Sequence, residues 1–434
     1  MHDSYYAASA NKIDPFPVLE ESMRCDVCVV GAGYTGLSTA LNLAEKGYSV
    51  IVLEAHRVGW GASGRNGGQV GSGLNWSQQD LEKQFGSQKA MGLWQLCEIA
   101  KQEVLNRIDR HSIDCDFKNG VISAAVTRSA ARQYATHVKH MHENYDYRSL
   151  RYVDRDEISD MLGTSRYFAG ALDASSGHLH PLNYAIGLVK AAASAGVQIF
   201  EGSKVHSYRY SASDASVETS CGAKVESNFL VFACNAYIGK LSPEFGRYIM
   251  PISSCIVATE PLGNDIATRI NRNDVAVHDS KFCLDYYRLS SDRRLLFGGA
   301  ERYVRNDRMD IEAKVAPRIC HLYPGLKGIR IDYAWSGMIA ITVSRLPSIG
   351  RVSPTVYFAQ GFSGHGVALT NLTGKIIAEA ISGTAERFDI LSSIPHRKFP
   401  GGEALHWPLH ILAMTYFNVL DKLKTQIDRF NRFE

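Results

Sequence analysis

A glycine-rich motif near the N-terminus, Gly31–Gly36 (Gly-Ala-Gly-Tyr-Thr-Gly), constrains the fold of this chain more than any other feature. An apolar segment typical of a buried strand, Cys25–Val30, precedes it, and a helical pattern follows over Tyr34–Lys46. A second strand pattern, Val50–Glu54, then ends in an acid about 20 residues after the motif. This order predicts a βαβ unit that binds a dinucleotide.

Each residue of the motif has an expected role. Gly31 permits the tight turn, Gly33 lets the backbone approach a pyrophosphate, and Gly36 lets helix and strand pack closely. The N–H groups at the helix start then face the pyrophosphate. We therefore predict cofactor contacts from all six positions, and we expect the Glu54 carboxylate to accept hydrogen bonds from both ribose hydroxyls. The predicted contact residues are Gly31, Ala32, Gly33, Tyr34, Thr35, Gly36, Glu54 and Ala55. The alternative is a strand-turn-helix without a ligand.

Two further loops are rich in glycine. The first directly follows the acid-tipped strand and has little side-chain bulk, so it suits a path alongside an extended cofactor. Its predicted contact residues are Arg57, Gly61, Ala62, Ser63, Arg65, Asn66, Gly67, Gly68 and Gln69. The second, Gly361–Gly366, precedes a helical pattern over Val367–Ile381, so Gly364, His365 and Gly366 lie at a helix N-terminus that favours negative charge. The alternative for the first loop is a mobile surface loop, and the alternative for His365 is a structural role.

The remaining periodicity predicts two interleaved lobes. Helices are predicted over Leu81–Arg110 and Leu182–Ala195. Strands are predicted over Gly120–Ala125, Val197–Phe200, Phe229–Ala233, Ile252–Glu260, Leu284–Leu289, Leu295–Ala300 and Thr355–Ala359. We expect an α/β FAD-binding Rossmann-like domain with an interleaved α+β antiparallel-sheet substrate domain. The cofactor domain is assigned residues 1–88, 152–243 and 336–434, and the substrate domain 89–151 and 244–335.

These motifs carry a family resemblance. Together with the Gly-Ala-Ser-Gly-Arg-Asn-Gly-Gly-Gln run of residues 61–69, they resemble the FAD-dependent amine and amino-acid oxidases of the D-amino-acid oxidase superfamily. The branch of γ-glutamylputrescine oxidases, from bacterial putrescine catabolism, is more similar still. This second resemblance is carried by Ser4–Lys12, Gly177–Asn183, Leu284–Leu289 and Phe399–Gly402, and it runs through nearly the whole chain.

The resemblance implies bound FAD and the oxidation of a primary amine. The imine hydrolyses to an aldehyde and ammonia, and oxygen reoxidises the flavin to give hydrogen peroxide. The resemblance also places the backbone of Val205 against the adenine. Around Ala233–Ala236 the superfamily usually has a glycine that this chain lacks. Hydride transfer to flavin needs orientation and desolvation rather than a dedicated base, so no catalytic residue is assigned.

Substrate contacts are expected from an aromatic, partly polar pocket. The candidates are Tyr286, Tyr287, Arg288 and Trp335, and the Thr342–Arg345 stretch is expected, like Trp335, to reach the flavin. Strand alternation puts Tyr286 and Arg288 on one face and Tyr287 on the other, and an arginine there would clamp a glutamyl carboxylate. Core tyrosines and a surface arginine are the alternative. His178 and His180 have no evident third ligand, so no metal site is predicted.

Composition limits which partners and which cellular location we expect. The chain has 434 residues and a formal net charge of +3, without a dense basic block, so nucleic acid is not expected as a partner. Nine scattered cysteines and no apolar stretch of membrane-spanning length favour a cytoplasmic protein that acts on a small amine and molecular oxygen. The amphipathic tail, residues 408–433, is interpreted as a core-covering helix, a partner-binding helix or a membrane-surface contact.

Three functions remain open from the sequence. The first is an amine oxidase acting on γ-glutamylputrescine or a related amine. The second is an FAD-dependent amino-acid dehydrogenase or demethylase that passes electrons to a quinone or partner flavoprotein. The third is a non-catalytic subunit that binds FAD as a structural element. Neither the oligomeric state nor a covalent flavin link is predicted.

Overall fold

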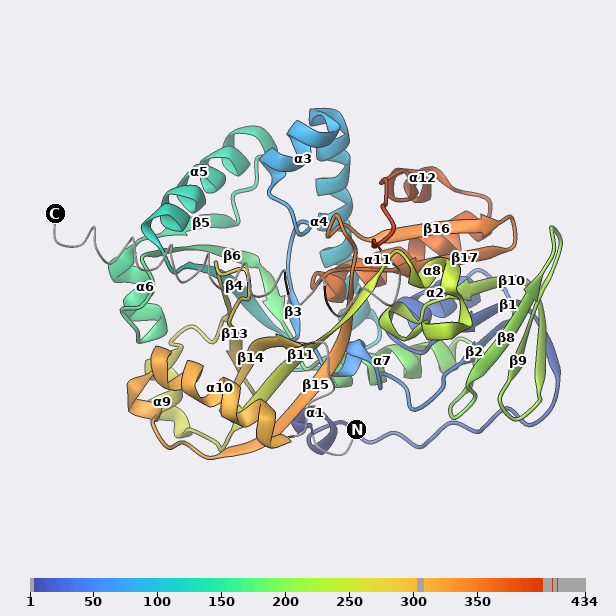
Figure 1. The fold of residues 1–434 in the computed structure, drawn as a ribbon, viewed down its shortest axis with the longest axis horizontal. Coiled ribbons are helices and arrows are strands. Elements are labelled where there is room, and N and C mark those ends of the chain that lie inside the picture. The colour runs from blue at the N-terminus through green and yellow to red at the C-terminus, as the bar shows by residue number, and fades with distance from the viewer. Residues whose placement is uncertain (1–3, 303–307, 401–407, 409–411, 413–434) are drawn as a thin grey trace.

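Two β-sheets organise the protein, and they lie side by side in Figure 1. In the computed structural model, the described residues are 4–302, 308–400, 408 and 412. Sheet A occupies the right of Figure 1 and ends in the β8–β9 hairpin at the outer edge. Sheet B occupies the left, where α5, α6, α9 and α10 surround it.

Sheet A has eight strands among the described residues. Its order is β16 (Ser348–Ser353), β17 (Val356–Gln360), β10 (Lys224–Phe232), β1 (Met23–Val30), β2 (Val50–Leu53) and β7 (Gln198–Phe200), with β9 (Ala215–Thr219) on β10 and β8 (Val205–Tyr210) on β9. The five strands from β17 to β7 are parallel, and β16, β9 and β8 join antiparallel. The carboxyl ends of β1, β2, β10 and β17 therefore share one edge, which is where open α/β sheets bind ligands.

Sheet B has nine strands in the same described ranges. Its order is β15 (Ile331–Ile341), β11 (Met250–Thr259), β14 (Leu295–Arg302), β13 (Tyr286–Leu289), β12 (Ala276–Asp279), β4 (Lys118–Ala125), β6 (Ala169–His178) and β3 (Gln69–Val70), with β5 (Leu150–Val153) on β6. All neighbours are antiparallel except β12 and β4. A parallel α/β lobe beside an antiparallel lobe confirms the predicted fold class.

Helices connect and cover the sheets. They are α1 (Tyr5–Ala8), α2 (Tyr34–Ala44), α3 (Gln78–Phe85), α4 (Ser87–Arg110), α5 (Arg128–Tyr145), α6 (Arg155–Leu162), α7 (Pro181–Ser194), α8 (Pro243–Gly246), α9 (Gly263–Ile270), α10 (Arg308–Leu322), α11 (Gly366–Ile381) and α12 (Glu386–Ser392), with short 3-10 helices η1 (Ala62–Gly64), η2 (Asn235–Tyr237), η3 (Gly239–Leu241) and η4 (Pro324–Leu326). Among the described residues, no helix combines the length and apolarity that crossing a membrane requires.

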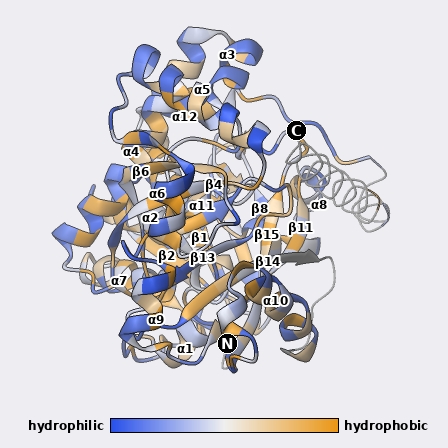
Figure 2. Cartoon of the chain, turned by 90° about the vertical axis from the view of Figure 1, so that its left-hand side faces the viewer, coloured by the Kyte–Doolittle hydropathy of each residue, from blue (hydrophilic) through white to orange (hydrophobic). Residues whose placement is uncertain are grey.

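Strand β1 forms the centre of sheet A because both of its faces are apolar. Val27 and Val29 point into the core cluster beneath α2 and α11, while Cys28 and Val30 point into the cluster on the opposite face. All four side chains are buried, as expected for a parallel strand covered on both sides. Figure 2 shows the same pattern, with hydrophobic residues along the inner strands and hydrophilic residues over the outer helices.

Helices α2 and α11 cross closely in the cofactor lobe. A Cβ at Gly374 would lie 2.6 Å from the Thr39 backbone nitrogen, so glycine is what allows the two helices to approach. The Ser38 hydroxyl donates to the Asn371 carbonyl at 2.6 Å across the same contact. Since α2 follows β1 and α11 follows β17, this packing brings two helix N-termini to the carboxyl edge of sheet A.

The predicted elements are largely confirmed, with one clear error. The segment predicted as one helix over Leu81–Arg110 is two helices, because Gly86 adopts a left-handed φ of 82° that ends α3 before α4 begins. The domain bounds remain a prediction. Strand β6 belongs to sheet B, although it lies within the range 152–243 that we assign to the cofactor domain. The predicted tail helix lies outside the described residues apart from positions 408 and 412.

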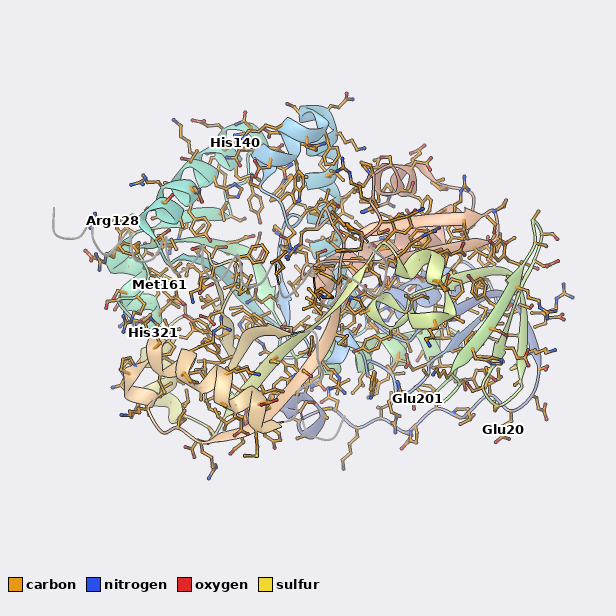
Figure 3. All side chains as sticks on the ribbon, viewed as in Figure 1. Glu20, Arg128, His140, Met161, Glu201 and His321 are labelled. Carbon is orange, nitrogen blue, oxygen red and sulfur yellow. The ribbon has the colours of Figure 1, made fainter. Side chains whose placement is uncertain are left out.

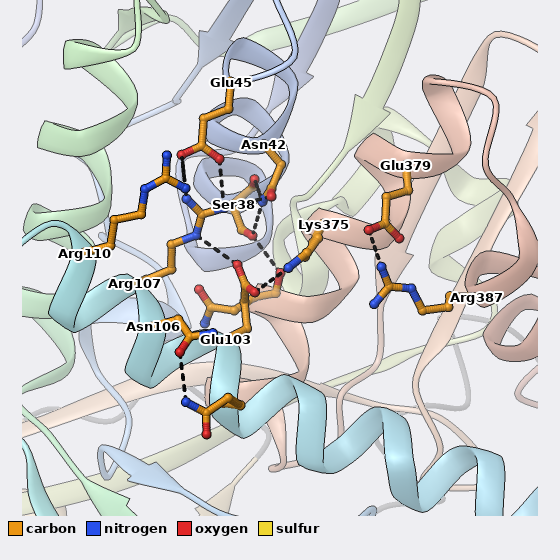
Figure 4. A network of polar contacts seen from close by, with 12 residues as sticks. Ser38, Asn42, Glu45, Glu103, Asn106, Arg107, Arg110, Lys375, Glu379 and Arg387 are labelled. Carbon is orange, nitrogen blue, oxygen red and sulfur yellow. Dashed lines mark hydrogen bonds and ion pairs between the residues drawn. The ribbon is translucent and has the colours of Figure 1, made fainter.

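A buried charged network joins α4 to α2 and α11 (Figure 4). Glu103 accepts hydrogen bonds from Arg107 Nε at 2.9 Å and from Lys375 Nζ at 2.7 Å. Arg107 also donates to Glu45 at 2.9 Å and to Asn42 at 2.8 Å. Glu103 and Arg107 are each 5% exposed, so protein groups rather than water bind their charged ends.

Replacing Glu103 by alanine is expected to lower the free energy of unfolding by about 3 kcal/mol, because it leaves Arg107 buried with one carboxylate fewer. Urea-induced unfolding measures this loss. Arg148→Ala is the matched control, since its ion pair with Asp146 is exposed and contributes about 0–1 kcal/mol. Equal losses in the two variants would show that the buried network does not stabilise the lobe.

Candidate functional site

The carboxyl edge of sheet A brings together four segments that are distant in sequence. Gly31 donates its N–H to Leu53 at 2.8 Å, and Ala233 donates to Val30 at 2.9 Å. Ser203, two residues before Val205, donates to the carbonyl of Glu54 at 2.8 Å. The motif and Glu54 therefore lie at neighbouring strand ends, and the segment just before Val205 reaches the same edge of the sheet, as a shared nucleotide site requires.

The three glycines of the motif fit their predicted roles to different degrees. Gly31 has a φ of 110°, and a Cβ there would lie 2.9 Å from the Ala233 carbonyl oxygen. A Cβ at Gly36 would lie 1.9 Å from the Gly31 carbonyl oxygen, so the close packing of helix on strand is confirmed. At Gly33 a Cβ would meet only the Ser63 side chain, at 2.8 Å from its Oγ. This position borders open space at the start of α2, a cradle that an added side chain would fill.

Glu54 holds the turn as well as facing the site. Its carboxylate accepts the Ala32 N–H at 2.8 Å and the His56 N–H at 2.9 Å. Burial raises its pKa, and the two backbone donors oppose that shift. A carboxylate has about four acceptor positions, so Glu54 retains capacity for ribose hydroxyls. Burial raises the pKa of the Cys234 thiol to about 12, and the charge of Glu54 adds to this shift.

The glycine-rich loop after β2 wraps over the motif. The Ser63 hydroxyl accepts the Tyr34 N–H at 3.0 Å, which ties the loop to the first turn of α2. Asn66 donates from its side chain to the Ala62 carbonyl at 3.0 Å and accepts the Gly68 N–H at 2.7 Å. The loop is thus preorganised by its own side chains, and its contacts with a cofactor remain a prediction.

Both arginines of this loop have protein partners. Arg57 pairs with Glu201, labelled in Figure 3, at 2.8 Å. Arg65 donates to the carbonyls of Trp60 at 2.7 Å and Ser336 at 3.1 Å, and its guanidinium lies over the Trp60 ring. Trp335 in turn donates its indole N–H to the Arg65 carbonyl at 3.1 Å. Arg65 and Trp335 therefore join the cofactor loop to β15 of sheet B.

Strand β13 confirms the predicted alternation and separates the tyrosines. Tyr286 lies on the cofactor-loop side, where a Cβ on Gly67 would be 2.9 Å from its ring. Tyr287 is 1% exposed in the core on the opposite face, stacked on Phe297. Tyr287 is thus a core side chain in this structure, and its contact with a substrate remains a prediction that the structure does not support.

Arg288 is buried and its donors are engaged. It is 2% exposed and donates to the Gly67 carbonyl at 3.0 Å, the Leu289 carbonyl at 3.1 Å and the Tyr6 hydroxyl at 3.3 Å. These contacts join the cofactor loop, sheet B and helix α1. The predicted carboxylate clamp at Arg288 remains a prediction, and the geometry supports a positioning role.

The second glycine loop leaves two of its residues accessible to solvent. Gly364 and His365 are exposed, and desolvation by the surrounding protein atoms lowers the pKa of the His365 imidazole. Burial lowers the pKa of His278, on β12, to about 4, and the charge of a protonated His365 would add to this shift. His278 contacts Ser123 Oγ at 2.8 Å and Gln69 Oε1 at 3.3 Å. Sequence analysis missed His278; its signal is a polar residue after the apolar pair Ala276–Val277.

His178 and His180 are structural residues. His180 accepts the Asn183 N–H at 3.1 Å and so caps α7, while His178 contacts the Asp274 carbonyl at 2.8 Å. Among the residues that the structure describes, no group of three or more His, Cys, Asp or Glu could hold a metal ion. Burial and, secondarily, the charge of Arg288 lower the pKa of each imidazole to about 3.

The depressed histidine pKa values predict acid sensitivity. The pKa of His180 rises from about 3 to about 6.5 on unfolding, so its contribution is fully present above pH 6.5 and is lost as the pH falls toward 3. At pH 5 this loss amounts to about 2 kcal/mol for one such histidine. His180→Asn keeps a cap residue without the titration, so its unfolding free energy should fall less between pH 7 and pH 5. Urea unfolding at both pH values measures the difference; equal slopes would contradict it.

Comparisons with known proteins agree with this geometry. A family model described as "FAD dependent oxidoreductase" matches residues 26–380. The chain is 42% identical to gamma-glutamylputrescine oxidoreductase of Escherichia coli K12, covering 97% of this chain and 98% of that protein, and 40% identical to a probable oxidoreductase OrdL of Haemophilus influenzae, covering 97% of each. The crystal structure of glycine oxidase from Geobacillus kaustophilus aligns with a TM-score of 0.70 at 22% identity, over 83% of this chain and 95% of that one. With a nucleotide-type motif at the sheet edge and a family match that spans both lobes, the chain belongs to the FAD dependent oxidoreductase family, and its cofactor is FAD.

Proposed function

We propose that this protein oxidises the terminal amine of γ-glutamylputrescine. One primary amine, one oxygen molecule and one water give the aldehyde, ammonia and hydrogen peroxide. The observation that carries the proposal is the 42% identity, over nearly the full length of both chains, to gamma-glutamylputrescine oxidoreductase. Oxygen as the electron acceptor is part of the proposal.

The residues present fit FAD. The Gly33 cradle and the N-terminus of α2 suit the pyrophosphate, and Glu54 suits the ribose. The N-terminus of α11, with Gly364 and His365, suits the redox-active ring system, because a helix start stabilises negative charge. When bound, FAD takes up the hydride from the carbon beside the amine.

The chain's own contribution is to orient a neutral amine and exclude water. Burial keeps the imidazole of His278 uncharged at neutral pH, since it lowers the pKa of that group to about 4. Neutral imidazoles accept hydrogen bonds and do not repel an ammonium group that approaches and loses its proton. Gln69 and Ser123 hold His278 in place from β3 and β4.

The test is the visible spectrum of the purified holoprotein during anaerobic addition of γ-glutamylputrescine. We expect loss of the oxidised-flavin absorbance, and its return in air with one peroxide per amine. Bleaching without peroxide would indicate a dehydrogenase, and a spectrum that no amine bleaches would indicate a non-catalytic flavoprotein. Either result would overturn the oxidase proposal.

A further inference from the structure

The loop that carries Arg345 contacts the segment that follows strand β12 of sheet B. The guanidinium of Arg345 lies 5.0 Å from the centre of the Phe282 ring. Phe282 lies four residues after His278, the β12 residue that contacts Gln69 and Ser123. Arg345 therefore lies near the end of the strand that carries this histidine.

The loop that carries Arg345 is held firmly against the His365 loop. The Ser363 N–H donates to the Ala340 carbonyl at 3.1 Å, and the Trp76 indole donates to the Ser344 carbonyl at 2.7 Å. The Arg345 N–H donates to the Thr342 carbonyl at 3.1 Å. These bonds fix where the Arg345 side chain leaves the loop.

Arg345 adopts a backbone conformation that disfavours it. Its φ is 61°, in the left-handed region that glycine enters without cost. A non-glycine residue there is strained, and such strain concentrates at ligand-binding sites. A side chain retained at that cost points to a function for the guanidinium.

The guanidinium of Arg345 is available for an anion. Across the described residues it has no carboxylate or hydrogen-bond partner, and it lies over the Phe282 ring. It is half-buried, so desolvation strengthens its attraction for a negative group. Arg288 differs, because its donors already bind three protein oxygens.

We propose that Arg345 binds the carboxylate of the glutamyl group, with Phe282 holding the guanidinium plane in position. The planar fork of arginine matches a carboxylate with two parallel hydrogen bonds. In γ-glutamylputrescine the carboxylate is at the opposite end from the terminal amine, so its anchor belongs at the rim of the site rather than beside the reacting carbon. This inference rests on the proposed function and names the residue that sets substrate specificity.

Arg345→Gly is the decisive variant, because glycine keeps the left-handed backbone and removes only the side chain. Loss of a charge-assisted pair should raise KM for γ-glutamylputrescine by roughly tenfold to a hundredfold, with kcat and FAD content little changed. KM for putrescine, which has no carboxylate, should stay the same. Arg345→Lys should recover part of the loss, and Arg351→Gly, on the exposed end of β16, is the control for charge alone.

A second measurement separates this inference from the proposed function. The probe is γ-glutamylbutylamide, which keeps the glutamyl group and lacks the terminal amine; its dissociation constant is read from the perturbed flavin spectrum without turnover. Weaker binding in Arg345→Gly than in the wild type supports the anchor even if the wild type fails to oxidise γ-glutamylputrescine. Equal dissociation constants, or no binding to the wild type, would overturn it.

Discussion

Replacing Gly33 by valine is expected to produce a folded protein that purifies without FAD. The nearest atom to an added Cβ is the mobile Ser63 Oγ at 2.8 Å, so the backbone of the βαβ unit can survive the change. The new side chain would occupy the cradle at the start of α2 and keep a pyrophosphate from the helix N–H groups. Loss of two such charge-assisted hydrogen bonds weakens FAD binding by about 100-fold or more.

The measurement is the ratio of flavin to protein absorbance, with circular dichroism to confirm folding. Gly92→Ala, on α4 with open space around its Cβ, is the control and should purify yellow. The double variant Gly33→Val with Ser63→Ala removes the contact with Ser63. If it regained full FAD occupancy, displacement of Ser63 rather than exclusion of the pyrophosphate would explain the loss.

Replacing Arg288 by alanine is expected to destabilise the protein and weaken FAD retention together. The change leaves three acceptors, on Gly67, Leu289 and Tyr6, without their buried donor. Each unsatisfied group costs about 1–3 kcal/mol, so the three together cost at least about 3 kcal/mol, which places this among the larger single-residue losses. Urea unfolding and FAD release on dilution measure the two effects.

Steady-state kinetics distinguish this positioning role from the predicted clamp. A positioning residue changes KM for γ-glutamylputrescine and for putrescine alike, because it acts through the cofactor loop. Arg288→Lys, which keeps the charge and loses the planar fork, should recover little stability. A selective rise in KM for the carboxylate-bearing amine would return Arg288 to the substrate pocket and weaken the case for Arg345.

The cofactor lobe was predictable because its signals are local. A continuous apolar run indicates a strand buried on both faces, and Val27 to Val30 are indeed buried on both. Glycine predicted a positive φ at Gly31 and a close approach at Gly36. The structure gives Gly31 a φ of 110°, and a Cβ added at Gly36 would lie 1.9 Å from the Gly31 carbonyl oxygen. Alternation along β13 likewise predicted that Tyr286 and Tyr287 face opposite ways.

The substrate side was less predictable because its partners are distant in sequence. Arg288 bonds to Tyr6, 282 residues away, and Trp335 bonds to Arg65, 270 residues away. Strand β3 is only Gln69–Val70, and it joins sheet B from within the cofactor loop. A two-residue strand has no periodicity to detect, so the junction of the two lobes was not visible in the sequence.

By itself the sequence determined the βαβ unit, the glycine-dependent turns and the family, because each depends on residue types at short, fixed spacing. Only the tertiary structure decided which side chains meet across the two sheets. It buried Tyr287 in the core, engaged Arg288 with three protein oxygens and left the Arg345 guanidinium over Phe282. The physical reason is that burial and partnership of a side chain depend on the packing of whole sheets and helices, which local patterns do not encode.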